Sequence, residues 1–398
     1  MENAALHTSE MKNYKLLILI VFILTLLTGF ILGKVLFPDY FRNNKSNINQ
    51  TPAEKIETNQ KVSDDRQTAI TRAIEKVSPT VVGINVEEVR EVQDPFANDP
   101  FFQQFFGNVE PQKQVVRGLG SGYIISEDGY ILTNDHVAGN ATKISVTLTT
   151  GETVDAKLIG SDPNTDVALL KIDKKNLPFI NFGNSDNVII GEWVIALGNP
   201  FGLFEINDKP TVTVGVISAS KMKLFAEGKR VYKDMLQTDA SINSGNSGGP
   251  LVDIEGNVIG MNTIIFTGSN YSSGSIGVGF AISINRVKRI MEDIKANGKI
   301  DRNYNPGFKI QPIDDRLAKY YNLNTKQGVI VVQVLKGGNA DNAGLKPEDI
   351  ILEANGEKIR NEQDLILIIN DLRTGDTVKL KIMRGNSEKE IDLKLSAQ

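Results

Sequence analysis

Between residues 118 and 284, short runs of apolar and β-branched residues alternate with turns rich in glycine, asparagine and aspartate. Short strands at this spacing are typical of an all-β barrel architecture. Representative runs are residues 143–148, 154–159, 193–197, 211–217 and 258–263. We therefore predict a β-barrel architecture for the central part of the chain.

A serine lies within the glycine-dense turn Gly-Asn-Ser-Gly-Gly-Pro at residues 245–250. A serine hydroxyl needs a nearby base to act as a nucleophile. The chain has two histidines, and His7 precedes a long apolar segment, so His136 is the candidate base for Ser247. The imidazole in turn needs an acceptor that fixes its tautomer, and Asp166 is the best candidate. The chain order of histidine, aspartate and serine is that of chymotrypsin, not that of subtilisin or the α/β-hydrolases.

Each of these residues also has a purely structural interpretation. A lone histidine is commonly a core or surface residue, and a Gly-Asn-Ser-Gly-Gly run is often only a loop. An aspartate after Pro-Asn-Thr is often a turn residue or a helix cap. The combination is more specific, because a strand-like apolar run lies next to each of His136, Asp166 and Ser247. Catalytic groups are expected on loops held by such a rigid scaffold.

At this point the chain resembles a known family, the HtrA/Deg-type serine proteases, in which a chymotrypsin-like protease domain is followed by a PDZ domain. The matching stretches are residues 118–122 (GLGSG), 131–137 (ILTNDHV), 166–169 (DVAL), 196–202 (ALGNPFG), 237–243 (QTDASIN), 245–250 (GNSGGP) and 278–282 (VGFAI). The resemblance implies a mainly β fold, with a double β-barrel protease domain and a small α+β PDZ domain. It also implies that His136 is the general base, Asp166 its orienting acceptor and Ser247 the nucleophile.

For such a protease we expect the backbone N–H groups of Gly245 and Ser247 to form the oxyanion hole. Donors of this kind typically contribute a few kcal/mol each in the transition state. Glycine at position 245 matters because a side chain would obstruct the turn that aims its N–H.

The primary specificity pocket is expected to prefer small or medium apolar side chains. The residue six positions before the nucleophile forms the pocket floor in chymotrypsin-like enzymes; here it is Ser241, so a preference for lysine or arginine is not expected. Four apolar residues are expected to flank the pocket and narrow it: Ile242, Ile264, Ile265 and Phe266. Discrimination by shape amounts to about 1–3 kcal/mol per methylene, so specificity should be loose.

The C-terminal part of the chain resembles a PDZ domain in residues 343–351 (AGLKPEDII) and 355–356 (NG). A PDZ groove binds an extended C-terminal peptide by adding a strand to a sheet edge. The candidate carboxylate-binding loop consists of Gly307, Phe308, Lys309 and Ile310. Lys309 stands where the family usually has glycine, so either the loop geometry differs or the lysine contacts the ligand. The alternative is that this domain only packs against the protease.

Composition narrows the function classes. The 398 residues are 40% hydrophobic and carry a net charge of −4, which argues against non-specific binding of nucleic acid. The chain contains no cysteine, so disulfides, thiolate catalysis and cysteine metal sites are excluded. With only two histidines, a zinc hydrolase is not expected either. We predict neither a cofactor nor a catalytic metal.

The N-terminal part predicts a membrane anchor. Residues 16–33 are almost wholly apolar and lie between Lys15 and Lys34; a helix of about 18 residues spans about 27 Å, close to a bilayer core. The alternative is a cleaved signal peptide, but no Ala-x-Ala site follows the segment.

The predicted organisation is a cytoplasmic tail at 1–15, a transmembrane anchor at 16–37, a flexible linker at 38–66, the protease domain at 67–298 and the PDZ domain at 299–398.

Residues 93–114 contain five phenylalanines in a polar, proline-interrupted segment. Burial of one aromatic side chain stabilises by about 2 kcal/mol, so these rings are expected to pack against something. In the resembling family, the corresponding loop can reach the active site of a neighbouring subunit. The alternative, given equal weight, is that the loop packs against the barrel of its own chain.

Together these features predict an extracytoplasmic serine endopeptidase, tethered to the membrane, that degrades misfolded or damaged envelope proteins. The family resemblance implies a homotrimer whose PDZ groove and active-site loops regulate cleavage. Two alternatives stay open: a regulatory protease that cuts one membrane signalling protein, and a chaperone or PDZ scaffold with incidental proteolysis.

Overall fold

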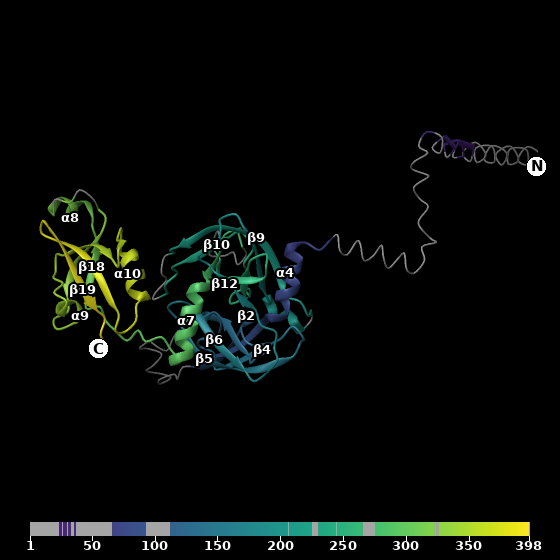
Figure 1. Ribbon diagram of the computed structural model, residues 1–398, viewed down its shortest axis with the longest axis horizontal. Helices are drawn as coiled ribbons and strands as arrows, with labels where there is room; N and C mark the ends of the chain where they lie inside the picture. The colour runs from purple at the N-terminus through teal and green to yellow at the C-terminus, as the bar shows by residue number, and fades with distance from the viewer. Residues whose placement is uncertain are drawn as a thin grey trace, which may run out of the picture. The chain divides into compact units, whose positions relative to one another are not determined.

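Figure 1 shows the computed structural model, which describes residues 24–25, 27–29, 31–32, 36, 66–92, 112–205, 207–224, 230–243, 245–265, 275–321, 323 and 326–397. The chain divides into two units, residues 1–67 and 68–398, which are taken separately. In the first unit, the described residues between 24 and 36 are helical. Within the described ranges, no helix combines the length and apolar character of a membrane span. Most of the anchor predicted at 16–37 lies outside those ranges.

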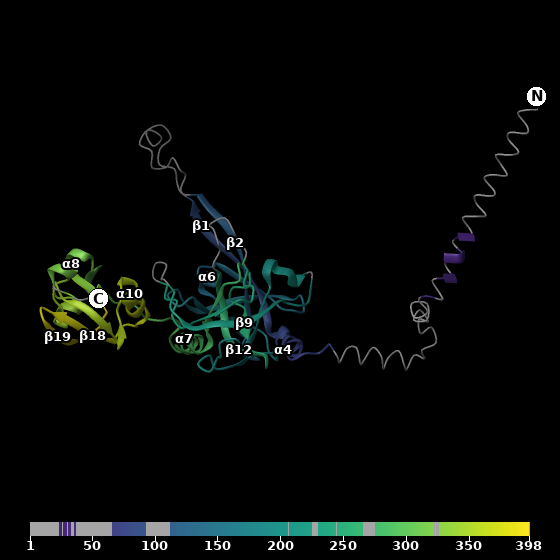
Figure 2. The same ribbon diagram turned by 90° about the horizontal axis from the view of Figure 1, so that it is seen from above.

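The first barrel of the second unit is closed, with its strands in the order β1-β2-β3-β6-β5-β4. Its strands are β1 (Val81–Val92), β2 (Gln112–Ile124), β3 (Tyr130–Thr133), β4 (Lys143–Thr147), β5 (Thr153–Asp162) and β6 (Val167–Ile172). Its interior is filled by fully buried aliphatic side chains such as Ile84, Ile131 and Leu170. Figure 2 shows the antiparallel pair β1 and β2 running well beyond the barrel wall. The predicted Phe-rich loop follows β1, and residues 93–111 lie outside the described part.

The second barrel is built from a seven-stranded sheet in the order β11-β8-β9-β10-β13-β12-β7, which an additional β11–β12 pairing closes. Its strands are β7 (Asn181–Phe182), β8 (Trp193–Gly198), β9 (Thr211–Met222), β10 (Met235–Thr238), β11 (Pro250–Val252), β12 (Asn257–Ile265) and β13 (Gly279–Ser283). Two antiparallel barrels in succession confirm the predicted mainly β, double-barrel fold class.

Short helices connect and cover the barrels: α4 (Ala69–Val77), η1 (Ser78–Thr80), α6 (Asp135–Ala138), η2 (Pro200–Glu205) and α7 (Ile284–Asn297). Helix α7 packs against β5 and β6 of the first barrel and β12 of the second, as Figure 1 shows. Its buried face carries Val287, Ile290 and Ile294 at helical spacing. Gly298 ends it in the left-handed region, at φ +74°.

A PDZ-type sheet follows, with five strands in the order β14-β15-β16-β18-β19 and β17 paired to β16. Its elements are β14 (Phe308–Pro312), α8 (Asp315–Tyr320), β15 (Val329–Val334), α9 (Asn339–Asn342), β16 (Ile350–Ala354), β17 (Glu357–Lys358), α10 (Glu362–Asp371), β18 (Thr377–Arg384) and β19 (Ser387–Lys394). Strand β14 is therefore an edge strand and keeps one side unpaired within this sheet.

Local interactions set the ends of two helices in this part of the chain. Helix α10 begins at Glu362, because the side chain of Asn361 caps it by accepting the N–H of Asp364 at 3.0 Å. Helix α9 ends at Asn342, shortly before Gly344, which adopts φ +82°.

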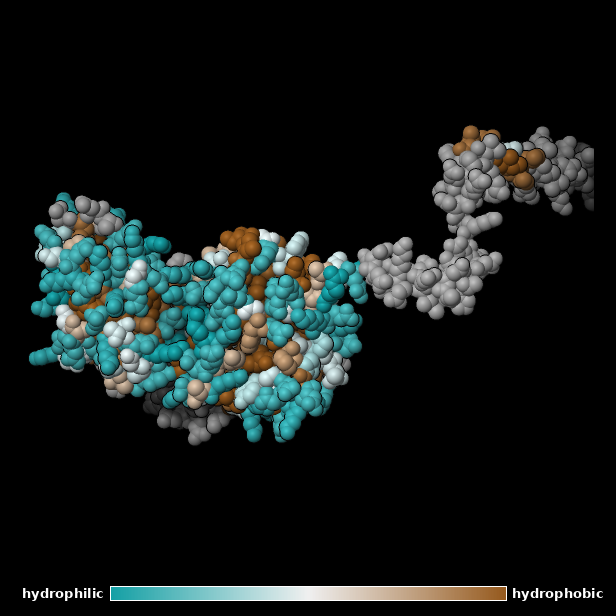
Figure 3. All heavy atoms as spheres, in the orientation of Figure 1, coloured by the Kyte–Doolittle hydropathy of each residue, from teal (hydrophilic) through white to brown (hydrophobic). Residues whose placement is uncertain are grey.

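The surface is mostly hydrophilic in the view of Figure 3, with apolar patches gathered on the protease barrels. Four exposed apolar side chains of the second barrel lie in or beside β8 and β9: Ile189, Ile190, Trp193 and Val214. Single exposed apolar residues are ordinary on soluble domains, but a group of them is characteristic of a contact surface.

Candidate active site

His136 and Asp166 form a direct pair between the first barrel's loops. His136 lies in α6 directly after β3, and Asp166 directly before β6. The imidazole Nδ1 is 2.8 Å from Oδ2 and 3.0 Å from Oδ1 of Asp166. The backbone N–H of His136 also donates to Oδ1, at 2.9 Å. One carboxylate thus holds both the ring and the backbone of the histidine, and the ring remains 31% exposed.

The Asp166 carboxylate is completely buried, and its backbone is in the left-handed region at φ 59°. Burial would raise its pKa, but hydrogen bonds and charge from His136, together with a hydrogen bond from Thr263, lower the pKa below its usual range. The carboxylate is therefore stabilised as an anion. An anion facing Nδ1 favours the tautomer that leaves Nε2 free to accept a proton.

Ser247 lies in the same cleft, but its hydroxyl points elsewhere. The Oγ donates to the backbone carbonyl of Thr263 at 3.1 Å, and the Thr263 hydroxyl donates to Oδ2 of Asp166 at 2.7 Å. One residue of β12 thus contacts both the serine and the aspartate. In this arrangement the hydroxyl is held by the second barrel and is not hydrogen-bonded to His136.

The turn that carries Ser247 depends on two glycines with positive φ. Gly245, at φ 95°, offers its carbonyl to the hydroxyl of Ser121 at 2.5 Å. Gly248, at φ 84°, lies so close to the first barrel that a Cβ would stand 2.2 Å from the Ser121 carbonyl oxygen. Neither the N–H of Gly245 nor that of Ser247 donates to a protein acceptor within the described residues. Two backbone donors are therefore available beside the serine hydroxyl.

These groups open on a cleft of about 490 Å³. Its lining includes Gly245, Ser247, His136 and the half-buried Arg230, together with Val86, Glu88, Val116, Gly118, Leu119, Val137, Asn140 and Ala141. His136, Gly245 and Ser247 thus line one cleft, although His136 is far from the other two in the chain.

The residues predicted for the specificity pocket lie in different environments. Ser241 is half-buried, with its carbonyl bonded to the Thr213 hydroxyl at 2.8 Å. Ile242 is fully buried in the core of the second barrel and does not line the cleft, because its side chain packs inward against Gly279. Ile264 and Ile265 belong to β12, and their side chains, like all of Phe266, lie outside the described part.

The predicted carboxylate-binding loop lies at the start of the edge strand β14. Gly307 has φ 83° and Phe308 begins the strand. A small hollow of about 290 Å³ is lined by Asn305, Gly307, Phe308, Lys309, Gln333 and Leu335. Lys309 is exposed, and Ile310 is partly buried against the PDZ core. The open edge of β14, Gly307 and Lys309 therefore lie together at the start of the strand.

Sequence reasoning missed three contributors to the site. Thr263 carried no signal, since its role depends on the packing of β12 against the first barrel. Ser121 lies in the quoted motif GLGSG, where a hydroxyl between glycines could have been singled out as a turn-supporting group. Arg230 lies on a loop far from any motif. Burial alone would lower the pKa of Arg230, but the charges of Asp166 and Asp135 raise it by more. The net pKa is therefore raised, and Arg230 remains a cation.

Comparisons with known proteins agree with this architecture. The trypsin-like peptidase domain family matches residues 120–261, which include His136, Asp166 and Ser247, and the PDZ domain family matches residues 307–395. A DegP-like periplasmic serine endoprotease of Hahella chejuensis is 39% identical over 338 residues, covering 82% of this chain and 69% of that protein. The chain belongs to the HtrA/DegP-like serine protease family.

Other relatives define how far the likeness extends. A DegP-like periplasmic serine endoprotease of Chlamydia muridarum is 45% identical over 309 residues, and this HtrA-type chain spans 59% of its length. The solved HtrA-type protease AlgW with a decapeptide has a TM-score of 0.64 at 35% identity, covering 83% of this chain and 99% of that one. The serine endoprotease of Yersinia pestis has a TM-score of 0.56 at 31% identity, covering 83% and 99%.

Proposed function

We propose that this HtrA-type chain is a serine endopeptidase that cleaves unfolded protein through a covalent acyl-enzyme. One observation carries the proposal: His136, paired with Asp166, lines a single cleft with Ser247 and Gly245, and no described residue accepts the backbone N–H of Gly245 or Ser247. Nucleophile, base, orienting carboxylate and oxyanion donors are the parts that acyl transfer requires. Membership of a serine protease family supports the same assignment.

The proposed reaction begins with a rotation of the Ser247 side chain away from the Thr263 carbonyl, toward Nε2 of His136. The serine oxygen then attacks the scissile carbonyl while His136 takes its proton and passes it to the leaving amine. Asp166 stabilises the imidazolium and remains an anion, because the hydrogen bonds and charge of His136 and the hydrogen bond of Thr263 hold its pKa below the usual range. Water repeats the sequence to release the acyl group.

The developing oxyanion would be bound by the N–H groups of Gly245 and Ser247. Neither N–H has an acceptor among the described residues, as such donors require before substrate arrives. For the primary pocket we retain Ser241 as the floor, with Ile264, Ile265 and Phe266 as neighbours, and a preference for small or medium apolar side chains. The inward packing of Ile242 means that it would shape the pocket only through the backbone.

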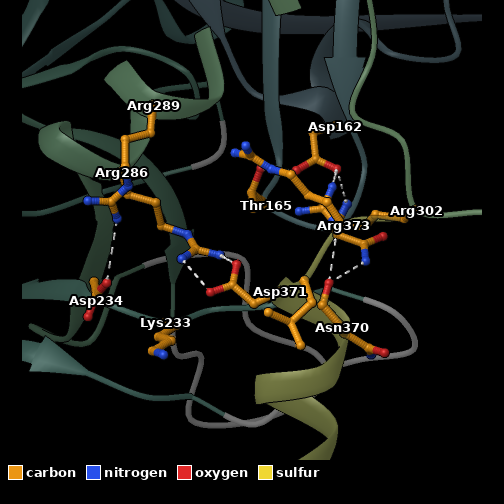
Figure 4. Close-up of polar contacts among 12 residues, drawn as sticks. Asp162, Thr165, Lys233, Asp234, Arg286, Arg289, Arg302, Asn370, Asp371 and Arg373 are labelled. Atoms are coloured by element: carbon orange, nitrogen blue, oxygen red, sulfur yellow. Dashed lines mark hydrogen bonds and ion pairs between the residues drawn. The ribbon is translucent and has the colours of Figure 1, made fainter. Parts of the chain in front are cut away.

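The PDZ domain would bind C-terminal peptides along the edge strand β14, with Gly307, Phe308, Lys309 and Ile310 at the carboxylate end. AlgW, a structural neighbour, is described with bound decapeptide and tripeptide. Regulation of cleavage by this domain is supported by ion pairs that join it to the protease barrels. In Figure 4, Arg286 of α7 forms a double contact with Asp371 of α10, at 2.5 and 3.2 Å.

The cellular setting completes the proposal. The apolar segment at 16–37 would anchor the chain, with the protease and PDZ domains on the extracytoplasmic side, as relatives described as periplasmic suggest. Substrates would be misfolded or damaged envelope proteins, and the assembly a homotrimer. A signalling protease that cuts one membrane regulator is the competing function, and its substrate range would be narrow.

Ser247→Ala tests the catalytic proposal directly. Because only a hydroxyl is lost from a half-buried position, folding should be retained while cleavage of unfolded casein falls by at least about 10³-fold. Cleavage rates are measured on the full chain, with circular dichroism as the folding control. Turnover near the wild-type rate would reject Ser247 as the nucleophile. Comparison of cleaved proteins in heat-stressed membranes, with and without the active enzyme, separates broad quality control from a single signalling substrate.

A further inference from the structure

The loop that carries Asp166 is held in place by Arg302, which is not one of the candidate catalytic residues. Asp162, at the end of β5, is 2% exposed. Its carboxylate accepts the hydroxyl of Thr165 at 2.5 Å and forms an ion pair with Arg302. A buried carboxylate is strongly destabilising unless a cation and hydrogen bonds compensate it. Arg302, whose side chain is 11% exposed, is the cation that does so.

This turn determines where the catalytic carboxylate points. Asp166 follows Thr165 directly and adopts the left-handed backbone region, which non-glycine residues rarely occupy without support. Its own backbone carbonyl accepts the side-chain amide of Asn134 at 2.9 Å. The turn is thus fixed on one side by Asn134 and on the other by Asp162 with Arg302.

Arg302 takes its own position from the PDZ domain. It belongs to the segment between α7 and β14, and its Nε donates to the backbone carbonyl of Asn370 at 3.1 Å. The side-chain amide of Asn164, within the Asp166 loop, donates to the same carbonyl at 3.0 Å. Asn370 lies in the last turn of α10, where carbonyls have no partner within the helix and carry partial negative charge. Figure 4 shows Arg302, Asp162, Thr165 and Asn370 converging on this point.

The segment beside Arg302 is secured as well. Thr374 of the PDZ domain donates its N–H to the Asp301 carbonyl at 2.9 Å, and its hydroxyl is 3.0 Å from the Asp301 carboxylate. The arginine is therefore held next to α10 by its neighbour in sequence.

We propose that Arg302 is a positioning residue of the protease, which holds the Asp166 loop through Asp162 and couples it to the last turn of PDZ helix α10. The inference rests on the proposed catalytic role of Asp166. Arg302 touches neither substrate nor the reacting atoms; it acts through the placement of the carboxylate that orients His136.

Arg302→Gln in the full chain tests this role. Loss of the ion pair should let the loop shift, and small misplacements of catalytic groups are costly, so we expect kcat to fall about tenfold with KM unchanged. Arg302→Lys keeps the charge and should recover part of the rate. Arg373→Gln is the matched control, because Arg373 also joins the PDZ domain to the protease, through Asp293 of α7, without contacting the Asp166 loop.

Active-site titration with a serine-directed phosphonate separates positioning from simple destabilisation. A positioning role predicts the wild-type number of reactive serines, each reacting more slowly; a purely structural role predicts fewer serines, each at the full rate. Should Arg302→Gln fail to fold, Thr165→Val removes a contact of Asp162 from within the loop and should show the same slower reaction per site.

Two outcomes would overturn the proposal, and they differ. If Arg302→Gln reacts per site as fast as Arg373→Gln while Asp166→Asn is inactive, Arg302 has no positioning role. If Asp166→Asn itself cleaves substrate at the wild-type rate, the catalytic assignment of Asp166 fails and the role of Arg302 fails with it.

Discussion

At the scale of single residues, two buried carboxyls at or near the site have pKa values that are shifted in opposite directions. Asp166 gains hydrogen bonds from His136 and Thr263, so its pKa is lowered despite full burial. Asp135, its neighbour, is also buried, but burial dominates there and the nearby charge of Asp166 adds to it, so its pKa is raised above the usual range. Burial raises the pKa of both carboxyls, but at Asp166 the hydrogen bonds and charge of His136 and the hydrogen bond of Thr263 outweigh it, whereas at Asp135 burial prevails.

A stability prediction follows for Asp135. A carboxyl whose pKa is raised on folding binds its proton more tightly in the folded state, so stability falls as pH rises above the unfolded value of about 3.9. Asp135→Asn removes that penalty without changing shape. We expect a higher melting temperature than wild type at pH 7 and a smaller difference at pH 4, measured by thermal unfolding. A difference independent of pH would contradict the electrostatic explanation.

At the scale of elements, the edge strand β14 makes a specific prediction about peptide binding. A peptide that adds to this strand would bring its C-terminal carboxylate to Gly307 and the exposed Lys309. Amidation of an apolar C-terminal peptide should weaken binding, measured by fluorescence anisotropy. Lys309→Gln should weaken binding of the free-acid peptide about two- to fivefold, since an exposed ion pair contributes up to about 1 kcal/mol. Lys319→Gln, on α8, is the control; equal losses in both variants would argue against a contact between Lys309 and the carboxylate.

At the scale of the whole molecule, the compact unit from Thr68 to Gln398 contains both barrels and the PDZ sheet. Because the apolar segment at 16–37 is the one predicted membrane signal, a chain beginning at Thr68 should remain in the supernatant after centrifugation of membranes and should cleave casein. The full chain should sediment with the membranes. A shortened chain that still sediments would show that the protease or PDZ surface binds membranes by itself.

The sequence by itself was sufficient for the features that depend on local patterns. Turn-separated β runs predicted the barrels. Motif order brought His136, Asp166 and Ser247 together as candidates. Tertiary structure decided what no local pattern encodes. The inward packing of Ile242, the double contact of Thr263 and the ion pair of Arg302 with Asp162 all join segments far apart in the chain. Contacts of that kind depend on tertiary packing, because side-chain periodicity specifies which face of an element is buried but not which distant residue it meets.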